Sequence, residues 1–152
     1  LRLKGYCGDA CVTYPVGHVT PHVDRLLDIG REALRVGIEA AQYDKHLNDI
    51  GKAIEGYADT QGVTVVHEWG GHGIGRALHE NLSVSHIRQP DPGPRLVPGM
   101  TFTIEPMINA GTHEWSLLTD GWTVITADGK LSVQFEHTLV ITRNGPEILT
   151  RL

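Results

Sequence analysis

The chain has 152 residues, 40% hydrophobic and 20% charged, which is enough for one domain with a buried core and too hydrophobic for intrinsic disorder. Its net charge of −5 argues against binding to nucleic acids or anionic membranes, because such proteins need a basic face. The sequence has no run of about 18 apolar residues that would predict a transmembrane helix. Two cysteines, Cys7 and Cys11, are too few for a disulfide framework, which favours the reducing cytoplasm.

The first third of the sequence predicts a short β segment followed by a long helix. Residues 3–17 alternate loosely and are punctuated by glycines, which predicts a bent strand or a hairpin. Thr20 and Pro21 indicate a helix start, because Thr is a favoured N-cap and Pro fits the first helical position. An apolar stripe at helical spacing runs to about residue 42 and comprises Val23, Leu26, Leu27, Ala33, Leu34, Ile38 and Ala41.

The middle of the sequence predicts a second helix and then a change of character. This helix is expected to start at Asp44 as its N-cap and to stop at Gly62, with inward residues Leu47, Ile50, Ile54 and Tyr57. Residues 63–66 then predict a short strand. Residues 67–96 are rich in Gly, His and Pro, which is typical of loop with short extended pieces.

The last third predicts antiparallel strands. Residues 100–107 alternate as a strand, and residues 115–127 predict one arm of a hairpin whose return strand is residues 132–142. Asp128–Gly129 would form the turn between these two arms. The order of strand, two helices and mostly antiparallel strands indicates an α+β domain with helices packed on a curved sheet.

Four of the nine histidines lie close together, and the segment His67–Glu80 holds three of them. His67 and His72 are five positions apart, which argues against the helical HExxH zinc motif. Glycines around His72 allow backbone or a ligand to approach closely. If residues 73–79 run extended, small residues share a face with His79 and clear space beside it. The alternative, which this segment alone favours, is a Gly-rich turn with a hydrogen-bonded histidine.

Two glutamates interrupt otherwise apolar strands. A carboxylate at Glu105 is costly to bury unless it is paired or bound to metal, and Pro106 cannot donate to a ladder, which predicts an edge, a bulge or a strand end. In residues 133–141, Glu136 lies on the face opposite the apolar residues and shares it with Gln134, Thr138 and Val140. The alternative for both glutamates is a solvated position on a half-exposed strand.

Asp9 follows Gly8 in a segment expected to be extended, where Asp is normally depleted. A turn aspartate is the alternative. Cys7 and Cys11 would share a strand face but lie too far apart to bridge, so we expect them to behave as small buried hydrophobes.

Asp9, His72, Glu105 and Glu136 together suggest a metal site. An oxygen-rich ligand set with a single imidazole suits Mn, Fe, Co or Zn, and especially two ions bridged by carboxylates. A hydroxide bridging two cations is a nucleophile at neutral pH, because the ions lower its pKa. His79, outside this set, is free to hydrogen-bond a substrate carbonyl or amide.

Four blocks of the sequence resemble the signature of the type I methionine aminopeptidases, in the same order and spacing over essentially the whole chain. They are residues 71–80, 98–107, 120–123 and 134–138. No long insertion separates residues 79 and 98, which favours type I over type II. The resemblance implies an α+β pita-bread fold of the peptidase M24 family, with a curved antiparallel sheet and helices on its outer face.

The resemblance also implies a role for each matched residue. Asp9 and Glu136 would bridge two divalent ions, and His72 and Glu105 would complete one of them. His79 would contact the scissile amide, and Glu105 would shuttle a proton. Trp122 and Leu78 would line the pocket for the methionine side chain. The alternative for Trp122 is a buried core aromatic.

The implied activity is metal-dependent removal of the initiator methionine from nascent polypeptides, with a metal-bridging hydroxide attacking the first peptide carbonyl. The implied cofactors are two divalent ions (Co, Mn, Fe or Zn), and the implied partners are a peptide or nascent-chain N-terminus and the ribosome. We expect a cytoplasmic monomer that binds neither nucleic acid nor membrane.

Xaa-Pro aminopeptidases and prolidases share this fold and these ligands, and they are the first alternative. Arg76 and the block Asp120–Thr123 favour the methionine enzymes. The second alternative is a non-catalytic binding module of the same fold, which the four intact ligand positions argue against.

One feature departs from the family pattern. The family's site includes a further Asp, whose position falls upstream of Leu1. Residues 1–152 are therefore expected to be the C-terminal portion of a single catalytic domain that lacks the N-terminal part of the fold. On that expectation, these residues alone bind at most one metal ion well and have little or no peptidase activity.

Overall fold

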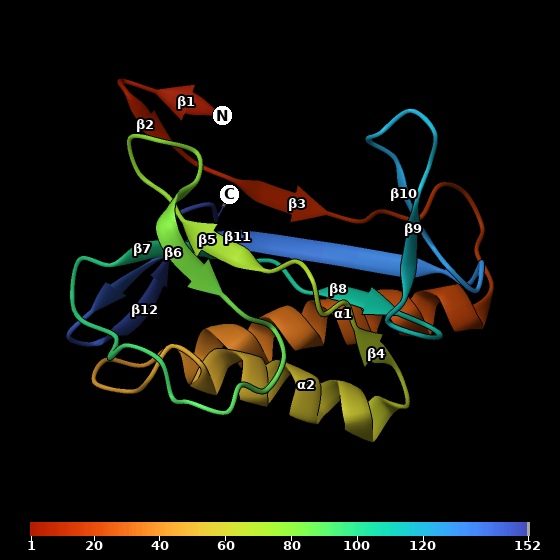
Figure 1. Cartoon of the computed structure of the whole chain (residues 1–152), viewed down its shortest axis with the longest axis horizontal. Coiled ribbons are helices and arrows are strands. Elements are labelled where there is room, and N and C mark those ends of the chain that lie inside the picture. Colours follow the sequence, from red (N-terminus) through yellow and green to blue (C-terminus); the bar gives the residue numbers. More distant parts are fainter. Residues whose placement is uncertain (152) are drawn as a thin grey trace.

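The structure is a computed structural model that describes residues 1–151. Two helices lie side by side along one face of a bent sheet, and the N-terminal segment and a hairpin rise from the opposite face (Figure 1). The fold is the α+β arrangement predicted from the order of elements. None of the helices within residues 1–151 combines the length and the apolar character needed to cross a membrane.

The first helix begins where the sequence predicts. Helix α1 spans Pro21–Ala40, and the carbonyl of Thr20 accepts hydrogen bonds from the backbone N–H groups of Val23 and Asp24. Its buried face contains Leu26, Leu27, Ile29, Ala33 and Leu34. The amphipathic stripe therefore identified the face of α1 that packs on the sheet.

The second helix starts later than predicted. Helix α2 spans Asp49–Gln61 and ends at Gly62, whose φ of 69° is the left-handed C-cap conformation expected of glycine. Asp44 is not its N-cap. Asp44 has a φ of 63°, and Arg95 Nη1 donates to its carbonyl and to its carboxylate. After this turn the helix begins at Asp49, with Asn48 as its N-cap.

The remaining elements are short strands around one long strand. Their bounds are β1 (Arg2–Leu3), β2 (Tyr6–Cys7), β3 (Ala10–Val12), β4 (Thr64–Val65), β5 (Gly71–Gly73), β6 (Glu80–Val84), β7 (Thr101–Ile104), β8 (Met107–Asn109), β9 (Trp115–Leu117), β10 (Val124–Thr126), β11 (Ser132–Thr142) and β12 (Gly145–Ile148). The main sheet has the order β4-β8-β11-β7-β5-β6, and β3 and β12 also pair with β11.

Strand β11 organises this sheet because it pairs along both edges. One edge pairs with β8 and then β7, and the other pairs with β3 and then β12, all antiparallel. Strands β7 and β8 are the predicted strand over residues 100–107, interrupted at Glu105–Pro106. The predicted break beside Pro106 is thus confirmed.

Two predicted extended segments differ in the structure. Residues 115–127 do not pair with β11, since β9 and β10 form their own hairpin. The Asp120 carboxylate closes that hairpin by accepting hydrogen bonds from the backbone of Trp122 and Thr123. Residues 75–79 are a series of bends rather than a strand, because Glu80 Oε1 accepts hydrogen bonds from the Arg76 and Ala77 N–H groups. The prediction that small residues of an extended segment 73–79 share a strand face with His79 is therefore wrong.

Strands β5 and β7 approach each other closely at Gly71. A Cβ atom added to Gly71 would lie 2.1 Å from the backbone oxygen of Thr103. We therefore expect Gly71→Ala to lower the free energy of unfolding by about 2–3 kcal/mol, a typical cost of overpacking a core, as measured by urea denaturation. The matched control is Gly8→Ala, because a Cβ atom there meets nothing within 4 Å. Equal urea midpoints for the two variants would contradict this expectation.

Candidate metal centre

The sheet register brings the four predicted ligands to one face. Continuing the β11–β7 register by one residue places Glu105 opposite Glu136, and continuing the β11–β3 register places Asp9 opposite Thr138. His72 lies in β5, the neighbour of β7. Residues that face each other across antiparallel strands project to the same side. Four neighbouring strands, or the residues directly beside them, thus each supply one predicted ligand. These residues lie on the face away from α1, because Val133 and Phe135 of β11 point toward Gly30 of that helix.

Three of these side chains form a compact group. One ligand atom each from Asp9, His72 and Glu136 lies within 4.8 Å of the others. Glu105 is outside that group of three, but its Oε1 lies 3.5 Å from Nε2 of His72, and Oδ2 of Asp9 lies 3.9 Å from the same nitrogen. The structure therefore brings all four predicted ligands to one place.

The ring of His72 is oriented for a cation. Its Nδ1 lies 3.0 Å from the carbonyl oxygen of Gly73. A carbonyl can only accept, so Nδ1 carries the proton. Nε2, the other ring nitrogen, faces the carboxylates of Asp9 and Glu105 and is the atom that would bind an ion. A second hydrogen bond that fixes the tautomer of a ligating histidine is the usual arrangement in metal sites.

Hydrogen bonds hold the Glu105 carboxylate from both sides. Thr103 Oγ1 donates to Oε1 at 2.7 Å, and Gln134 Nε2 donates to Oε2 at 3.2 Å. Burial nevertheless raises the pKa of Glu105 above its ordinary value, and the Thr103 hydrogen bond partly opposes that rise. Glu105 is thus a fixed carboxylate at the edge of the cluster.

Glu136, in contrast, is buried without a partner. The residue is 5% exposed, and its Oε1 has no hydrogen-bond partner among residues 1–151. Burial, followed by the nearby charges of Glu105 and Asp9, raises the pKa of Glu136 to about 8. An unpaired buried carboxylate beside two others is unfavourable, and a bound cation would remove that penalty. The Glu136 Oε1 atom, which has no hydrogen-bond partner among the described residues, is the observation that supports a metal ion at these residues.

Two buried side chains outside the predicted ligand set, Thr138 and His86, contact the predicted ligands. Thr138 Oγ1 accepts from the Asp9 N–H at 3.0 Å and donates to the Asp9 carbonyl at 2.7 Å. His86 accepts a hydrogen bond at Nε2 from the Glu105 N–H at 3.3 Å, and burial lowers the pKa of His86 to about 3. Thr138 lies two positions after Glu136 and therefore on the same face of β11, and this spacing is the signal that could have identified the threonine. No sequence pattern indicates the contact made by His86.

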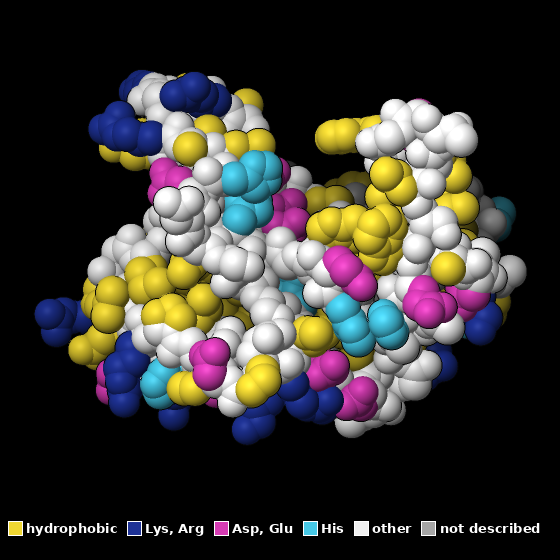
Figure 2. All heavy atoms as spheres, viewed as in Figure 1, with side chains coloured by type: hydrophobic (Ala, Val, Ile, Leu, Met, Phe, Trp, Pro, Cys, Tyr) yellow, Lys and Arg dark blue, Asp and Glu magenta, His cyan; other side chains and the backbone are white. Residues whose placement is uncertain are grey.

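An open cleft gives access to the cluster. Asp9, His72, His79 and Glu105 line a cavity of about 890 Å³. Figure 2 shows the hollow between the β1–β2 corner and the β9–β10 hairpin, with histidine and acidic side chains at its base. The ring centroids of His72 and His79 lie 4.2 Å apart. His79 is therefore placed to contact a molecule that reaches the cluster.

The predicted side-chain pocket is not reproduced by the cleft. Leu78 and Trp122 are 42% and 86% exposed, and neither lines the cleft formed by the described residues. The alternative that Trp122 is a core aromatic is wrong, because Asp120 directs the tip of the β9–β10 hairpin into solvent. The aromatic wall of the cleft consists instead of Trp69 and Trp115, whose rings are 4.6 Å apart.

Known proteins resemble this chain in sequence and structure. A family model described as metallopeptidase family M24 matches residues 1–143. Methionine aminopeptidase A of Synechocystis sp. is 50% identical over 148 residues, which cover 97% of this chain and 58% of the relative. A methionine aminopeptidase structure from Rickettsia prowazekii superposes with a TM-score of 0.95 at 43% identity, covering 98% of this chain and 60% of that one.

A prolidase from Pyrococcus furiosus has a TM-score of 0.76 at 24% identity, which shows a common fold alone. The chain spans 58% of the length of the Synechocystis relative and 61% of that from Bacillus subtilis. The pita-bread fold and the family model over residues 1–143 together show that the chain belongs to metallopeptidase family M24.

Proposed function

We propose that this site belongs to a metal-dependent methionine aminopeptidase that removes the initiator methionine from nascent polypeptides. The observation that carries the proposal is the unpaired, buried carboxylate of Glu136 beside Asp9, His72 and Glu105. The relatives at 44–50% identity named methionine aminopeptidases support this activity over others of the family.

Each residue has a chemical role in this proposal. Asp9, His72, Glu105 and Glu136 would hold divalent ions, with Co, Mn, Fe and Zn all compatible with the donor set. Such ions supply Lewis-acid polarisation of a peptide carbonyl and lower the pKa of water. His79 hydrogen-bonds the scissile amide from the wall of the cleft. Glu105, held by Thr103 and Gln134, transfers a proton to the departing amine.

The proposed substrate is a polypeptide with a free N-terminal methionine, and its proposed setting is the cytoplasm, with the ribosome as the source of nascent chains. Leu78 and Trp122 remain proposed contacts of the methionine side chain. The open cleft supports a peptide substrate, since it leads from solvent to His79 and Glu105. We propose that the protein acts as a monomer.

A substrate panel tests this function. The chain is incubated with Mn²⁺ or Co²⁺ and with Met-Ala and Ala-Pro peptides, and release of the first residue is measured. Because the chain spans about three-fifths of its relatives, the ratio of the two rates is the readout rather than their size. Faster cleavage of Met-Ala peptides is expected, and faster cleavage of Ala-Pro peptides would indicate a prolidase-like activity instead.

Replacing His79 separates substrate contact from metal binding. We expect His79→Ala to abolish the residual rate of the chain on the Met-Ala peptide, because losing a group that stabilises developing charge usually costs about 100-fold or more. Calorimetric Co²⁺ affinity should remain within about twofold, because His79 is outside the ligand group. His22→Ala, at an exposed position of α1, is the control and should change neither quantity. An unchanged rate for His79→Ala would contradict the assigned role.

A further inference from the structure

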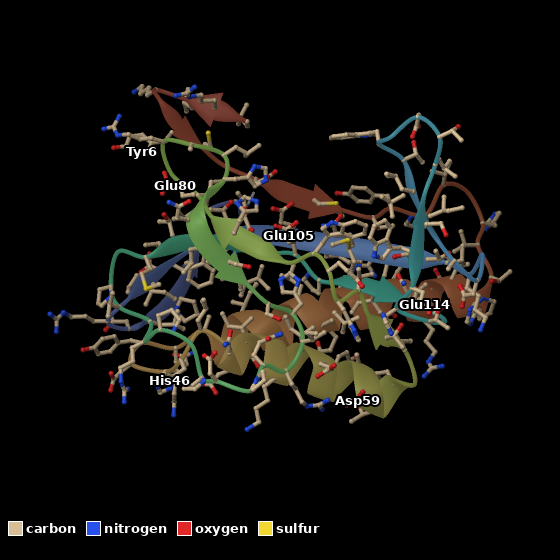
Figure 3. All side chains as sticks on the ribbon, in the orientation of Figure 1. Tyr6, His46, Asp59, Glu80, Glu105 and Glu114 are labelled. Carbon is tan, nitrogen blue, oxygen red and sulfur yellow. The ribbon has the colours of Figure 1, made fainter. Side chains whose placement is uncertain are left out.

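The Thr103 hydroxyl contacts two of the ligand residues at once. Thr103 lies in β7, two positions before Glu105, and is fully buried at 0% exposure. Its Oγ1 lies 2.9 Å from the His72 backbone nitrogen and 2.7 Å from Glu105 Oε1. Figure 3 shows Glu105 over β11, on the side of the sheet away from the helices. Thr103 is thus positioned between a ligand on β5 and a ligand at the end of β7.

The direction of both hydrogen bonds follows from the atoms involved. The backbone N–H of His72 can only donate, so the hydroxyl oxygen accepts from it. The single hydroxyl proton then goes to the Glu105 carboxylate, since the other acceptor within reach, the His72 carbonyl, is 3.5 Å away. A hydrogen bond to an ionised carboxylate is stronger than one between neutral groups. Both bonds therefore have one direction and cannot exchange roles.

Neighbouring strands pack closely around the hydroxyl on both sides. The backbone of Gly71 runs so close to Thr103 that a Cβ atom would lie 3.1 Å from Oγ1. On the other side, Thr103 pairs with Thr138 of β11, and Thr138 bonds both backbone polar groups of Asp9. Thr103 is β-branched, which further restricts its χ1 angle.

We propose that Thr103 is a positioning residue of the metal centre, whose hydroxyl holds the Glu105 carboxylate against His72 before an ion binds. The inference rests on the proposed function of these residues as a metal site. It predicts that ion affinity depends on the hydroxyl group itself and not only on the volume of the side chain. Outer partners of metal ligands typically contribute about 10-fold to 100-fold to affinity.

Three variants of the 152-residue chain test the proposal. Thr103→Val keeps the shape and removes the hydroxyl, and Thr103→Ser keeps the hydroxyl. Thr142→Val removes a half-buried hydroxyl at the end of β11 that bonds only the local hairpin. Co²⁺ binding is measured by calorimetry and by the visible absorption of the bound ion. We expect about a 10-fold or larger loss of affinity and an altered absorption spectrum for Thr103→Val. Thr103→Ser should stay within about threefold of wild type, and Thr142→Val should match it.

The outcomes distinguish this inference from the proposed function. If wild type binds Co²⁺ and Thr103→Val binds it equally well, the positioning role is overturned while the metal centre stands. If Thr103→Ser loses as much affinity as Thr103→Val, packing rather than the hydroxyl is responsible, and the inference is also overturned. A wild-type chain that binds no Co²⁺ would overturn both. Should Thr103→Val fail to fold, Thr103→Ala and Thr142→Ala provide the same comparison with less steric demand.

Discussion

Glu136→Gln is expected to weaken Co²⁺ binding by about 100-fold or more and, at the same time, to stabilise the metal-free chain at pH 8 and above. The loss of affinity follows from removing a ligand's charge, which costs at least as much as removing an outer partner. The gain in stability follows because the wild-type residue is 5% exposed and its Oε1 has no partner among the described residues. Calorimetry with Co²⁺ and urea denaturation of the metal-free protein measure the two effects.

The control for this substitution is Glu147→Gln in β12. Glu147 is exposed on its strand, so the same chemical change should leave both ion affinity and unfolding unchanged. A Glu136→Gln variant that loses stability at high pH would show that the Glu136 charge is already compensated in the metal-free chain. A variant that retains full Co²⁺ affinity would remove Glu136 from the ligand set.

The stability of the metal-free chain should fall between about pH 6.5 and pH 8. The pKa of Glu136 is raised from 4.5 to about 8, so its contribution is fully present below pH 4.5 and is lost as the pH rises through 8. One such group changes the free energy of unfolding by about 1.4 kcal/mol per pH unit, so the fall from pH 6.5 to pH 8 is about 2 kcal/mol. The raised pKa of Glu105 acts in the same direction.

The protonation of His86 changes stability with pH in the direction opposite to that of Glu136, and it limits the predicted fall in stability to pH values above about 6.5. Its pKa is lowered from 6.5 to about 3, so its contribution is present above pH 6.5 and is lost as the pH falls toward 3. His137, with a lowered pKa, adds to it. The contributions of Glu136 and His86 oppose each other between pH 4.5 and 6.5, which leaves the net fall at higher pH.

Urea denaturation at pH 5, 6.5 and 8 checks this profile. We expect similar midpoints at the two lower values and a lower midpoint at pH 8. Glu136→Gln should abolish most of the fall, and saturating Co²⁺ should do the same in wild type, because the ion compensates the carboxylates. A midpoint that rises from pH 6.5 to 8 in the metal-free wild type would contradict the raised pKa of Glu136.

The sequence predicted the elements whose signals are local. The stripe and Thr20–Pro21 located α1, Gly62 located the end of α2, and the alternation in β11 put Glu136 on the face opposite the core. These features depend on period and on conformational preference, which neighbouring residues determine. The ligand set came from the family resemblance and from glutamates misplaced in apolar strands, and the register of β11 explains why they meet.

The predicted bounds of helices and strands were wrong where a side-chain carboxylate, rather than a backbone carbonyl, accepts the hydrogen bonds that shape the chain. Asp44, Glu80 and Asp120 each bond nearby groups through their carboxylates and so change the path of the chain. Such contacts have no period in the sequence. The roles of His86 and Thr103 depend on contacts across the fold, over sequence separations of 19 and 31 residues. Only the folded arrangement of β5, β6 and β7 reveals these two supports.

A crystal of the chain grown with MnCl₂ would test the metal centre most directly, because the anomalous scattering of Mn²⁺ locates the ion without reference to activity. We expect a peak at coordination distance, about 2–2.3 Å, from Asp9, His72 and Glu136, with Glu105 beside it. An ion bound elsewhere while these four side chains remain free of metal would contradict the assignment of this cluster as a metal site.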